Sequence, residues 1–207
     1  MSGSVSKHRR QAVGWAAAII CLFAAAQVTG AALYRLDVSS SGDRYHVTAE
    51  AQLNADPADV HAAIMDIVHL PQISPDIHKA VVIRRVNVNA EVVYMETHIC
   101  VGIFCRTLKQ MQQITEISSQ DIVAVTLPEG SNVQGSSSWH LQADAGGTRM
   151  YWETTLEPDF WLPPFIGPLL VREAVQEQAE VFIHGIETYA TNRRTAAWAR
   201  TNPGSTP

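Results

Sequence analysis

The sequence lacks the short motifs that mark several common enzyme classes. Its 207 residues contain no Gly-Ser-type nucleophile elbow, no phosphate-binding glycine loop and no zinc-binding helix motif. It also has no internal repeat and no long low-complexity stretch. These absences argue against a hydrolase, a nucleotide-binding enzyme or a metalloprotease of the familiar kinds.

Basic residues are scarce. The chain has 15 Lys and Arg against 20 Asp and Glu, and Lys7, Arg9 and Arg10 all lie in the N-terminal segment. The remainder therefore has 12 basic and 20 acidic residues, a formal charge of −8. A nucleic-acid-binding protein would show a basic stripe, and adhesion to anionic lipid needs positive charge. We expect no nucleic-acid partner and no electrostatic membrane binding.

Cysteine is also rare, with only Cys21, Cys100 and Cys105 in the chain. Cys21 lies in the apolar N-terminal segment, which leaves the pair Cys100 and Cys105. Their Cys-x4-Cys spacing is compatible with metal ligands, a redox pair or a structural disulfide. The compartment that the chain enters decides between these readings.

Residues 1–30 are typical of a bacterial export signal, with a charged start, an apolar run from Ala12 to Ala26 and small residues after it. We expect cleavage, because the polar break at Gln27 to Gly30 falls where a signal is cut. The alternative is a retained anchor, since Ala12 to Leu33 is about long enough to span a bilayer core. The segment predicts a periplasmic or secreted protein with a Sec-type signal. A retained anchor would hold it at the inner membrane, facing the periplasm.

An oxidising compartment favours pairing of the two remaining cysteines. Cys100 and Cys105 enclose a four-residue hairpin loop, so they would face each other across two strand ends. We therefore predict a disulfide between Cys100 and Cys105, and no metal site.

The rest of the chain is expected to form one domain. We assign residues 31–42 to a linker, 43–195 to the folded domain and 196–207 to a disordered tail. About 170 residues are enough for one hydrophobic core.

Alternating hydrophobicity predicts seven strands, and helical spacing predicts a short helix region after the first strand and a long C-terminal helix. The strands are expected at 45–53, 79–88, 91–101, 106–117, 121–129, 136–145 and 148–158. The long helix has one continuous face, formed by Val171, Val175, Gln178, Phe182, Ile186 and Tyr189. The fold class is α+β, with an antiparallel sheet curved around this helix.

This order of elements resembles the helix-grip fold of the START-like superfamily, also called SRPBCC, which includes polyketide cyclases/dehydrases and coenzyme Q-binding START-type proteins. The most telling segments are DIVHLPQISPDIHKAVVI, from Asp66 to Ile83, and FWLPPFIGPLLVREAVQ, from Phe160 to Gln176. The resemblance implies a cavity between the sheet and the C-terminal helix that holds an apolar or amphipathic molecule.

The residues expected at this cavity are aromatic or contain sulfur. Alternation favours the inner face for Met95, Met111, Trp139 and Trp152, and the helix contributes Phe182. Phe160, Trp161 and Phe165 lie on a proline-rich loop that would cover the cavity mouth. The alternative interpretation makes the inner-face residues ordinary core and the loop residues an anchor for the start of the helix.

No residue is predicted to be catalytic, and no cofactor is expected. If the protein were an enzyme, Glu96 and His98, which share a strand face with Tyr94, would be the best candidates. The leading hypothesis is instead an exported binding or carrier protein for a hydrophobic molecule such as a lipid, a quinone-like or a polyketide-like compound. The alternatives are a cyclase or dehydratase that uses polar residues in the same cavity, and a protein-interaction module. The sequence does not predict an oligomeric state.

Overall fold

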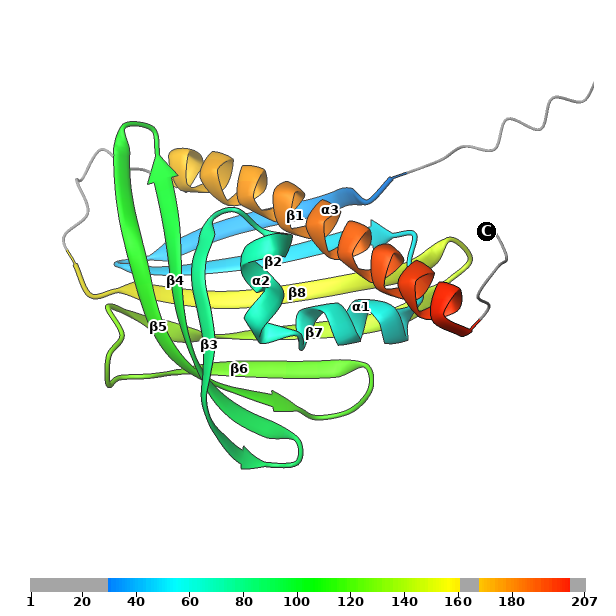
Figure 1. The fold of residues 1–207 in the computed structure, drawn as a ribbon. Helices are drawn as coiled ribbons and strands as arrows, with labels where there is room; N and C mark the ends of the chain where they lie inside the picture. The colour runs from blue at the N-terminus through cyan, green and yellow to red at the C-terminus, as the bar shows by residue number, and fades with distance from the viewer. Residues whose placement is uncertain (1–29, 161–167, 202–207) are drawn as a thin grey trace, which may run out of the picture.

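The computed structural model describes residues 30–160 and 168–201. They form an α+β fold in which an antiparallel sheet curves around a long helix, as the sequence predicts (Figure 1). The strands are β1 (Ala32–Ser41), β2 (Arg44–Leu53), β3 (Ile77–Asn87), β4 (Ala90–Val101), β5 (Phe104–Glu116), β6 (Asp121–Leu127), β7 (Val133–Asp144) and β8 (Gly147–Pro158). The helices are α1 (Pro57–Ile64), the short 3-10 helix η1 (Ile67–His69), α2 (Leu70–Ile73) and α3 (Pro168–Thr201).

The sheet has the order β1-β2-β8-β7-β6-β5-β4-β3. All neighbours are antiparallel, and all but one pair are consecutive along the chain. The exception is β2, which pairs with β8 near the end of the strand sequence. The chain then crosses from β2 to the opposite edge of the sheet, β3, through α1, η1 and α2 (Figure 1). The helices and the concave face of the sheet thus enclose one interior.

The sheet has eight strands, so the expected count of seven was wrong. The extra strand, β1, occupies the residues assigned to a linker, 31–42. Its register shifts between Leu33 and Arg35, which places Tyr34 in a bulge with 60% of its surface exposed. Leu33 and the buried Leu36 therefore both pack inward although they lie three residues apart. The bulge breaks the two-residue period, and this is why the strand was missed.

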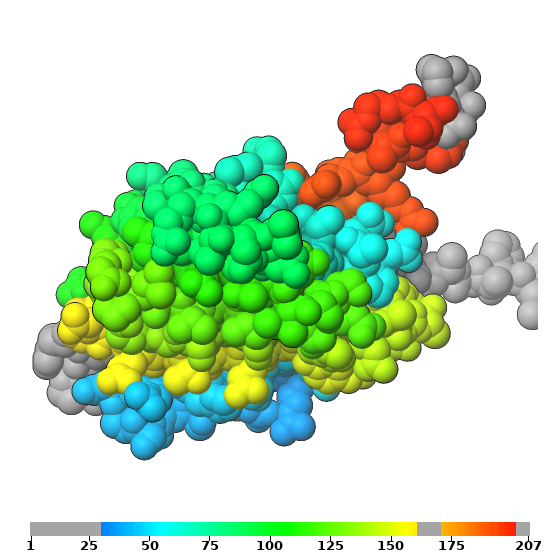
Figure 2. Space-filling view, turned by 90° about the horizontal axis from the view of Figure 1, so that it is seen from below, coloured from blue at the N-terminus to red at the C-terminus, as the bar shows by residue number. Residues whose placement is uncertain are grey.

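The long helix also extends further than expected. Helix α3 ends at Thr201, so residues 196–201, assigned to a disordered tail, are helical. Every residue from 191 to 201 is exposed, and the end of α3 projects beyond the body of the domain (Figure 2). The expected export signal at 1–30 lies almost entirely outside the described residues. None of the helices within the described ranges is long and apolar enough to cross a membrane.

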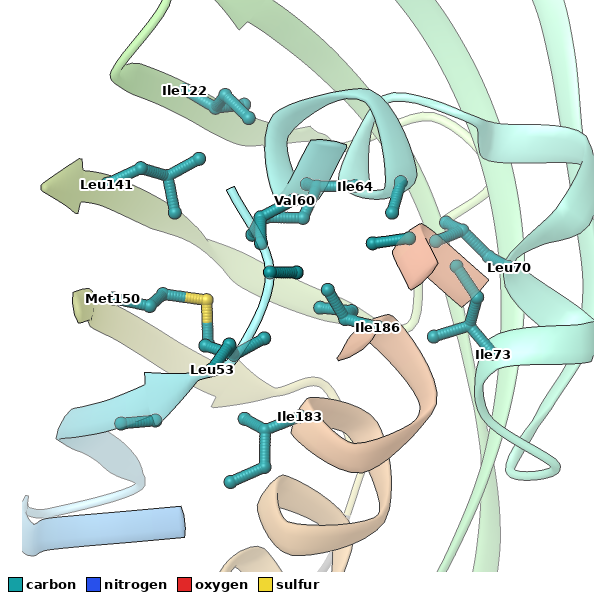
Figure 3. Packing of buried hydrophobic residues seen from close by; sticks show 14 of the residues in the cluster. Leu53, Val60, Ile64, Leu70, Ile73, Ile122, Leu141, Met150, Ile183 and Ile186 are labelled. Carbon is teal, nitrogen blue, oxygen red and sulfur yellow. The ribbon is translucent and has the colours of Figure 1, made fainter. Parts of the chain in front are cut away.

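The hydrophobic core lies where α1, η1 and α2 meet the sheet and the second half of α3. Leu53, Leu141 and Ile122 from three strands are fully buried against Val60 of α1 and Ile186 of α3 (Figure 3). Burial of each such side chain stabilises the fold by about 1.5–3 kcal/mol. The core therefore fixes the middle of α3, where Ala179, Ile183, Ile186 and Ala190 are buried, to the rest of the domain.

Helix α3 makes a close backbone approach to α2 at Gly185. A Cβ atom at this position would lie 1.9 Å from the carbonyl oxygen of Ile73. The two backbones can approach this closely only because position 185 has no side chain. Ala179 and Ala190 of the same helix are also buried, on another side of it.

A polar cluster around Asp66, between α1 and η1, adds a second attachment for α3. The Tyr189 hydroxyl donates to Asp66 Oδ2 at 2.7 Å, and Arg193 Nη1 donates to the same oxygen at 3.0 Å. His69 Nδ1 lies 2.7 Å from the other carboxylate oxygen. Burial raises the pKa of Asp66, but the hydrogen bonds of His69 and Tyr189 and the charges of His69 and Arg193 outweigh it, so the pKa lies below its usual value.

We expect Gly185→Ala to destabilise the protein by about 1–3 kcal/mol, because the new methyl group forces α3 away from α2. In an uncrowded helix the same change would stabilise the protein by about 1 kcal/mol. The sign of the change in the free energy of unfolding therefore shows whether position 185 is crowded. Urea unfolding measures it. Gly146→Ala is the control, since its Cβ would make only an ordinary 3.6 Å contact with Gln52, and its midpoint should move little.

The second prediction concerns acid stability. The pKa of Asp66 is lowered in the folded state. The contribution of the Asp66 carboxylate to the free energy of unfolding is therefore complete above the ordinary carboxyl pKa, and it is lost as the pH falls through the lowered pKa. Asp66→Asn should therefore cost about 1–3 kcal/mol at pH 7, and this difference from wild type should shrink in acid. Urea midpoints of both proteins between neutral and acidic pH provide the measurement. An unchanged difference across that range would contradict the assignment.

Candidate ligand cavity

One helix does not fill the concave face of the sheet, and a cavity remains between the first half of α3 and strands β2, β4, β5, β7 and β8. It has two parts, which we call the apolar arm and the polar arm. The apolar arm has a volume of about 120 Å³ and the polar arm about 200 Å³. Both parts are lined by Val47, Ile99, Leu108, Leu156, Val175 and Gln178, so the two are adjacent.

The apolar arm lies near the tip of the β4–β5 hairpin and the beginning of α3, which are neighbours in Figure 1. The hairpin contributes Val101 and Phe104, and α3 contributes Val171 and Ala174. Strand β8 and the residues after it close the arm with Pro158 and Phe160. This surface can bind hydrocarbon and offers few hydrogen bonds.

The polar arm lies further from the hairpin tip and combines aromatic with neutral polar side chains. Gln110 and Gln112 on β5 are polar, but their side chains point to the interior and are only 8% and 5% exposed. Ser137 Oγ and Thr154 Oγ1, on paired strands, lie 2.5 Å apart in a hydrogen bond. Gln110 Nε2 makes only a long hydrogen bond of 3.5 Å to Thr126 Oγ1. Buried amides with few strong protein partners can bind a polar group of a ligand.

Trp152 contributes a further polar group to this wall. Its indole Nε1 is buried and has no hydrogen-bond partner among the described residues. A buried donor without a partner costs about 1–3 kcal/mol. Trp152 lines the polar arm and is paired across the strands with Trp139, so an acceptor arriving through the cavity could satisfy it after a small rotation of the ring.

Charged groups are rare on the cavity wall. Among the described lining residues, Asp76 is the one carboxylate and Arg106 the one cation. Arg106 is exposed, and its Nη1 donates to the carbonyl oxygen of Cys105 at 3.1 Å. Asp76 follows α2 and is half-buried at the edge of the polar arm. The interior between them is neutral.

The structure brings together most of the residues predicted at the cavity. Met95, Trp139, Trp152 and Phe182 line the polar arm, and Phe160 lines the apolar arm. Their role in ligand binding stays a prediction. Trp161 and Phe165 lie outside the described residues.

Met111 lies on the opposite face of the sheet, so its assignment to the inner face was wrong. It pairs with Tyr94 and alternates with the inward Gln110 and Gln112. The inner positions of β5 also include the buried Leu108 and Ile114. Leu108 and Ile114 are separated by an even number of residues, which is the spacing of one strand face. This spacing could have shown that they and the two glutamines between them form the inner face of β5.

Tyr94, Glu96 and His98 also lie on the outer face of β4, away from the cavity. The Tyr94 hydroxyl donates to Glu96 Oε1 at 2.7 Å, and this bond, with burial, raises the pKa of Tyr94. The inner face of the same strand carries Met95 and Thr97. Glu96 and His98 therefore cannot act on a molecule in the cavity.

The predicted disulfide between Cys100 and Cys105 is confirmed. The two residues are directly paired across β4 and β5, with Cα atoms 4.0 Å apart. The turn is tighter than the expected four-residue loop, because Val101 and Phe104 are themselves paired. Ile103 at the turn is 91% exposed. The disulfide thus fixes the hairpin whose inner side forms the end of the apolar arm.

Comparison with known families gives one match over most of the domain. A family model described as polyketide cyclase / dehydrase and lipid transport matches residues 44–191. A comparison with curated proteins found no match.

Solved structures share the fold at low sequence identity. The Zhui aromatase/cyclase from Streptomyces sp. R1128 is 16% identical, with a TM-score of 0.59 over 74% of this chain and 98% of its own. A STAR-related lipid transfer protein from Xanthomonas axonopodis is 15% identical, with a TM-score of 0.54 over 76% and 98%. Human STARD10 is 10% identical, with a TM-score of 0.55 over 81% and 76%. These similarities confirm the helix-grip fold expected from the sequence.

Met95 and Met111 lie on opposite faces of the sheet, so the same substitution at each position tests whether the cavity binds the ligand. We expect Met95→Lys to abolish the fluorescence rise of an apolar dye in the cavity, because it places a charge in a neutral interior. Met111→Lys should bind the dye as wild type does. Circular dichroism of both variants checks that they are folded. Equal loss in the two folded variants would contradict the assignment of faces.

Proposed function

The chain belongs to the polyketide cyclase/dehydrase and lipid transport family, and on that premise we propose that it is an exported binding or carrier protein for a neutral amphipathic molecule. The family binds hydrophobic ligands and lipids, and the fold of this chain fits that role. The proposed ligand occupies the cavity between the sheet and the first half of α3.

One observation carries the proposal: the apolar arm and the polar arm lie side by side and share six lining residues. A molecule with a hydrocarbon part and a polar part would find a matching surface for each. Transfer of a methylene group from water into the apolar arm contributes about 0.8 kcal/mol. Several methylenes suffice for micromolar affinity after the costs of association.

The chemistry of the polar arm narrows the ligand to uncharged polar groups. Gln110, Gln112, Ser137 and Thr154 offer neutral donors and acceptors, and the Trp152 indole offers a donor. Away from Asp76 at the edge of the arm, a phosphate or an ammonium group would lose its hydration without an opposite charge to compensate. Carbonyl, hydroxyl or ester groups suit this surface better, as in quinone-like, polyketide-like or neutral lipid molecules.

Export is supported by the N-terminal sequence and by the cysteines. Residues 1–30 have the order of charges and apolar residues typical of a signal peptide. A disulfide between the two exposed residues Cys100 and Cys105 persists best in an oxidising compartment. We therefore propose a periplasmic or secreted location.

The second candidate function is a cyclase or dehydratase, and Asp76 is the observation that favours it. An acid–base step needs an ionisable group at the cavity, and Asp76 is the carboxylate of the described lining. It lines the same arm as Thr97 and Gln110, so it could contact a polar part of the substrate.

We expect Ala174→Trp to weaken binding of an apolar dye at least tenfold, because the indole fills space in the apolar arm that two ligand methylenes would use. The matched control is Ala197→Trp, the same change on an exposed position of the same helix. It should bind the dye like wild type. Saturation curves, with competition by a neutral lipid, provide the measurement.

Native mass spectrometry of the wild-type protein should detect a co-purified hydrophobic molecule that Ala174→Trp lacks. Equal dye affinity of the two tryptophan variants would refute the carrier proposal. Chemical conversion of a bound polyketide-like compound, lost in Asp76→Asn, would instead support the cyclase.

A further inference from the structure

The outer side of the β4–β5 hairpin carries a second group of chemically reactive side chains. His98, Cys100 and Cys105 offer one nitrogen and two sulfurs, all within 4.8 Å of one another. They lie on the face opposite to the ligand cavity, so the proposed function does not use them. Cys100 and Cys105 are exposed, and His98 is half-buried.

We propose that reduction of the Cys100–Cys105 disulfide converts this group into a binding site for a thiophilic metal ion of the Zn²⁺ type. The protein ligands are the two thiolates and His98 Nε2, and His78 supplies the fourth. This proposal is independent of the ligand in the cavity.

The distance between His98 and Cys100 fits tetrahedral coordination. His98 Nε2 lies 3.8 Å from Cys100 Sγ. Zn–S and Zn–N bonds of about 2.3 and 2.0–2.1 Å at a tetrahedral angle place the two ligand atoms about 3.6 Å apart. A small movement of these side chains would therefore bring both atoms to a shared ion.

The orientation of the His98 ring is also suited to metal binding. Its Nδ1 lies 3.4 Å from the hydroxyl oxygen of Thr107, the residue paired with it on β5. Donation from Nδ1 to this hydroxyl leaves a lone pair on Nε2, the nitrogen that faces the sulfur. Histidines that bind metals are commonly held by such a hydrogen bond at the other ring nitrogen.

His78 reaches the same place because of an irregularity in β3. The register of β3 on β4 shifts between Ile77 and Lys79, which leaves His78 as the extra residue. Its ring stacks on His98 with centroids 5.4 Å apart and an angle of 11° between the planes. Bulges commonly redirect a side chain towards a functional site. His78 is exposed, so its ring can turn towards an ion beside His98.

Nearby carboxylates and cations do not obstruct the site. Glu96, two residues before His98 on the same face, accepts the hydrogen bond of the Tyr94 hydroxyl. The Lys79 ammonium lies over the Tyr94 ring, 5.5 Å from its centroid. Two thiolates and two imidazoles form a ligand set that Zn²⁺ prefers.

The redox step requires a dithiol as reductant. The dithiol donates two electrons and two protons, the Cys100–Cys105 bond breaks to give two thiols, and the dithiol becomes a disulfide. Binding of Zn²⁺ then releases the two thiol protons to water. The metal would thus join the two strands in place of the covalent bond.

The test uses the full chain with Cys21→Ser, so that Cys100 and Cys105 are the only thiols. After reduction with a dithiol and its removal without oxygen, the protein should bind one Zn²⁺, measured by competition with a chromophoric chelator. Co²⁺ should give the absorption of a tetrahedral thiolate site. The oxidised protein should show neither signal.

Variants separate the ligands. His98→Ala should weaken Zn²⁺ binding about 100-fold or more, and His78→Ala at least tenfold, whereas Thr107→Val should cost roughly tenfold through the orientation of His98. His140→Ala is the matched control, since His140 pairs with Asp121 on a distant part of the sheet, and it should leave the affinity unchanged. Circular dichroism checks the fold of each reduced variant.

Equal Zn²⁺ affinity of reduced wild type and His98→Ala would overturn the proposal, as would a cobalt spectrum without tetrahedral character. Equal binding by the oxidised protein would overturn it as well. An unchanged affinity in His78→Ala would refute the fourth ligand.

Discussion

The close contact between α3 and α2 is the constraint on which the arrangement of the domain depends. At Gly185 the helix touches the carbonyl of Ile73 without a side chain between them. Around that point α3 packs into the core through Ile183, Ile186 and Ala190. The first half extends past the core and spans the concave sheet. The same helix therefore seals the fold at one end and forms the wall of the cavity at the other.

These two roles of α3 explain why the apolar stripe predicted from hydrophobic spacing describes the contacts of the helix only in part. The predicted stripe included Val171, Val175, Gln178 and Phe182, and all four line the cavity. Ile186 of the same stripe is fully buried in the core, together with residues that the stripe did not include, Ala179, Ile183 and Ala190. Hydropathy identifies the helix and its general face. It gives little weight to alanine and glycine, which decide how closely the helix can approach.

The same reasoning shows why the cavity was predicted incompletely. Inward positions were assigned by hydrophobic character, which works for Met95 and Trp139 but fails on β5. There the inner face carries Gln110 and Gln112, while Met111 points outward. A cavity that binds a polar group must place polar residues inside, and this weakens the alternation that strand prediction uses. The disulfide was predictable because the export signal indicates an oxidising compartment and the short spacing places Cys100 and Cys105 on the two strands of one hairpin.

The pairing of β2 with β8 has a consequence for folding. Leu53 is paired with Thr148, and nearly all the other strands lie between them in the sequence. Contacts of such high sequence separation form slowly, because a long loop must close before they add stability. Until β8 and α3 are available, β2 has an unpaired edge and the future cavity wall faces water. The binding cavity therefore requires the last strand and the last helix of the domain, and a chain that lacks them exposes an apolar surface and a strand edge that favour aggregation.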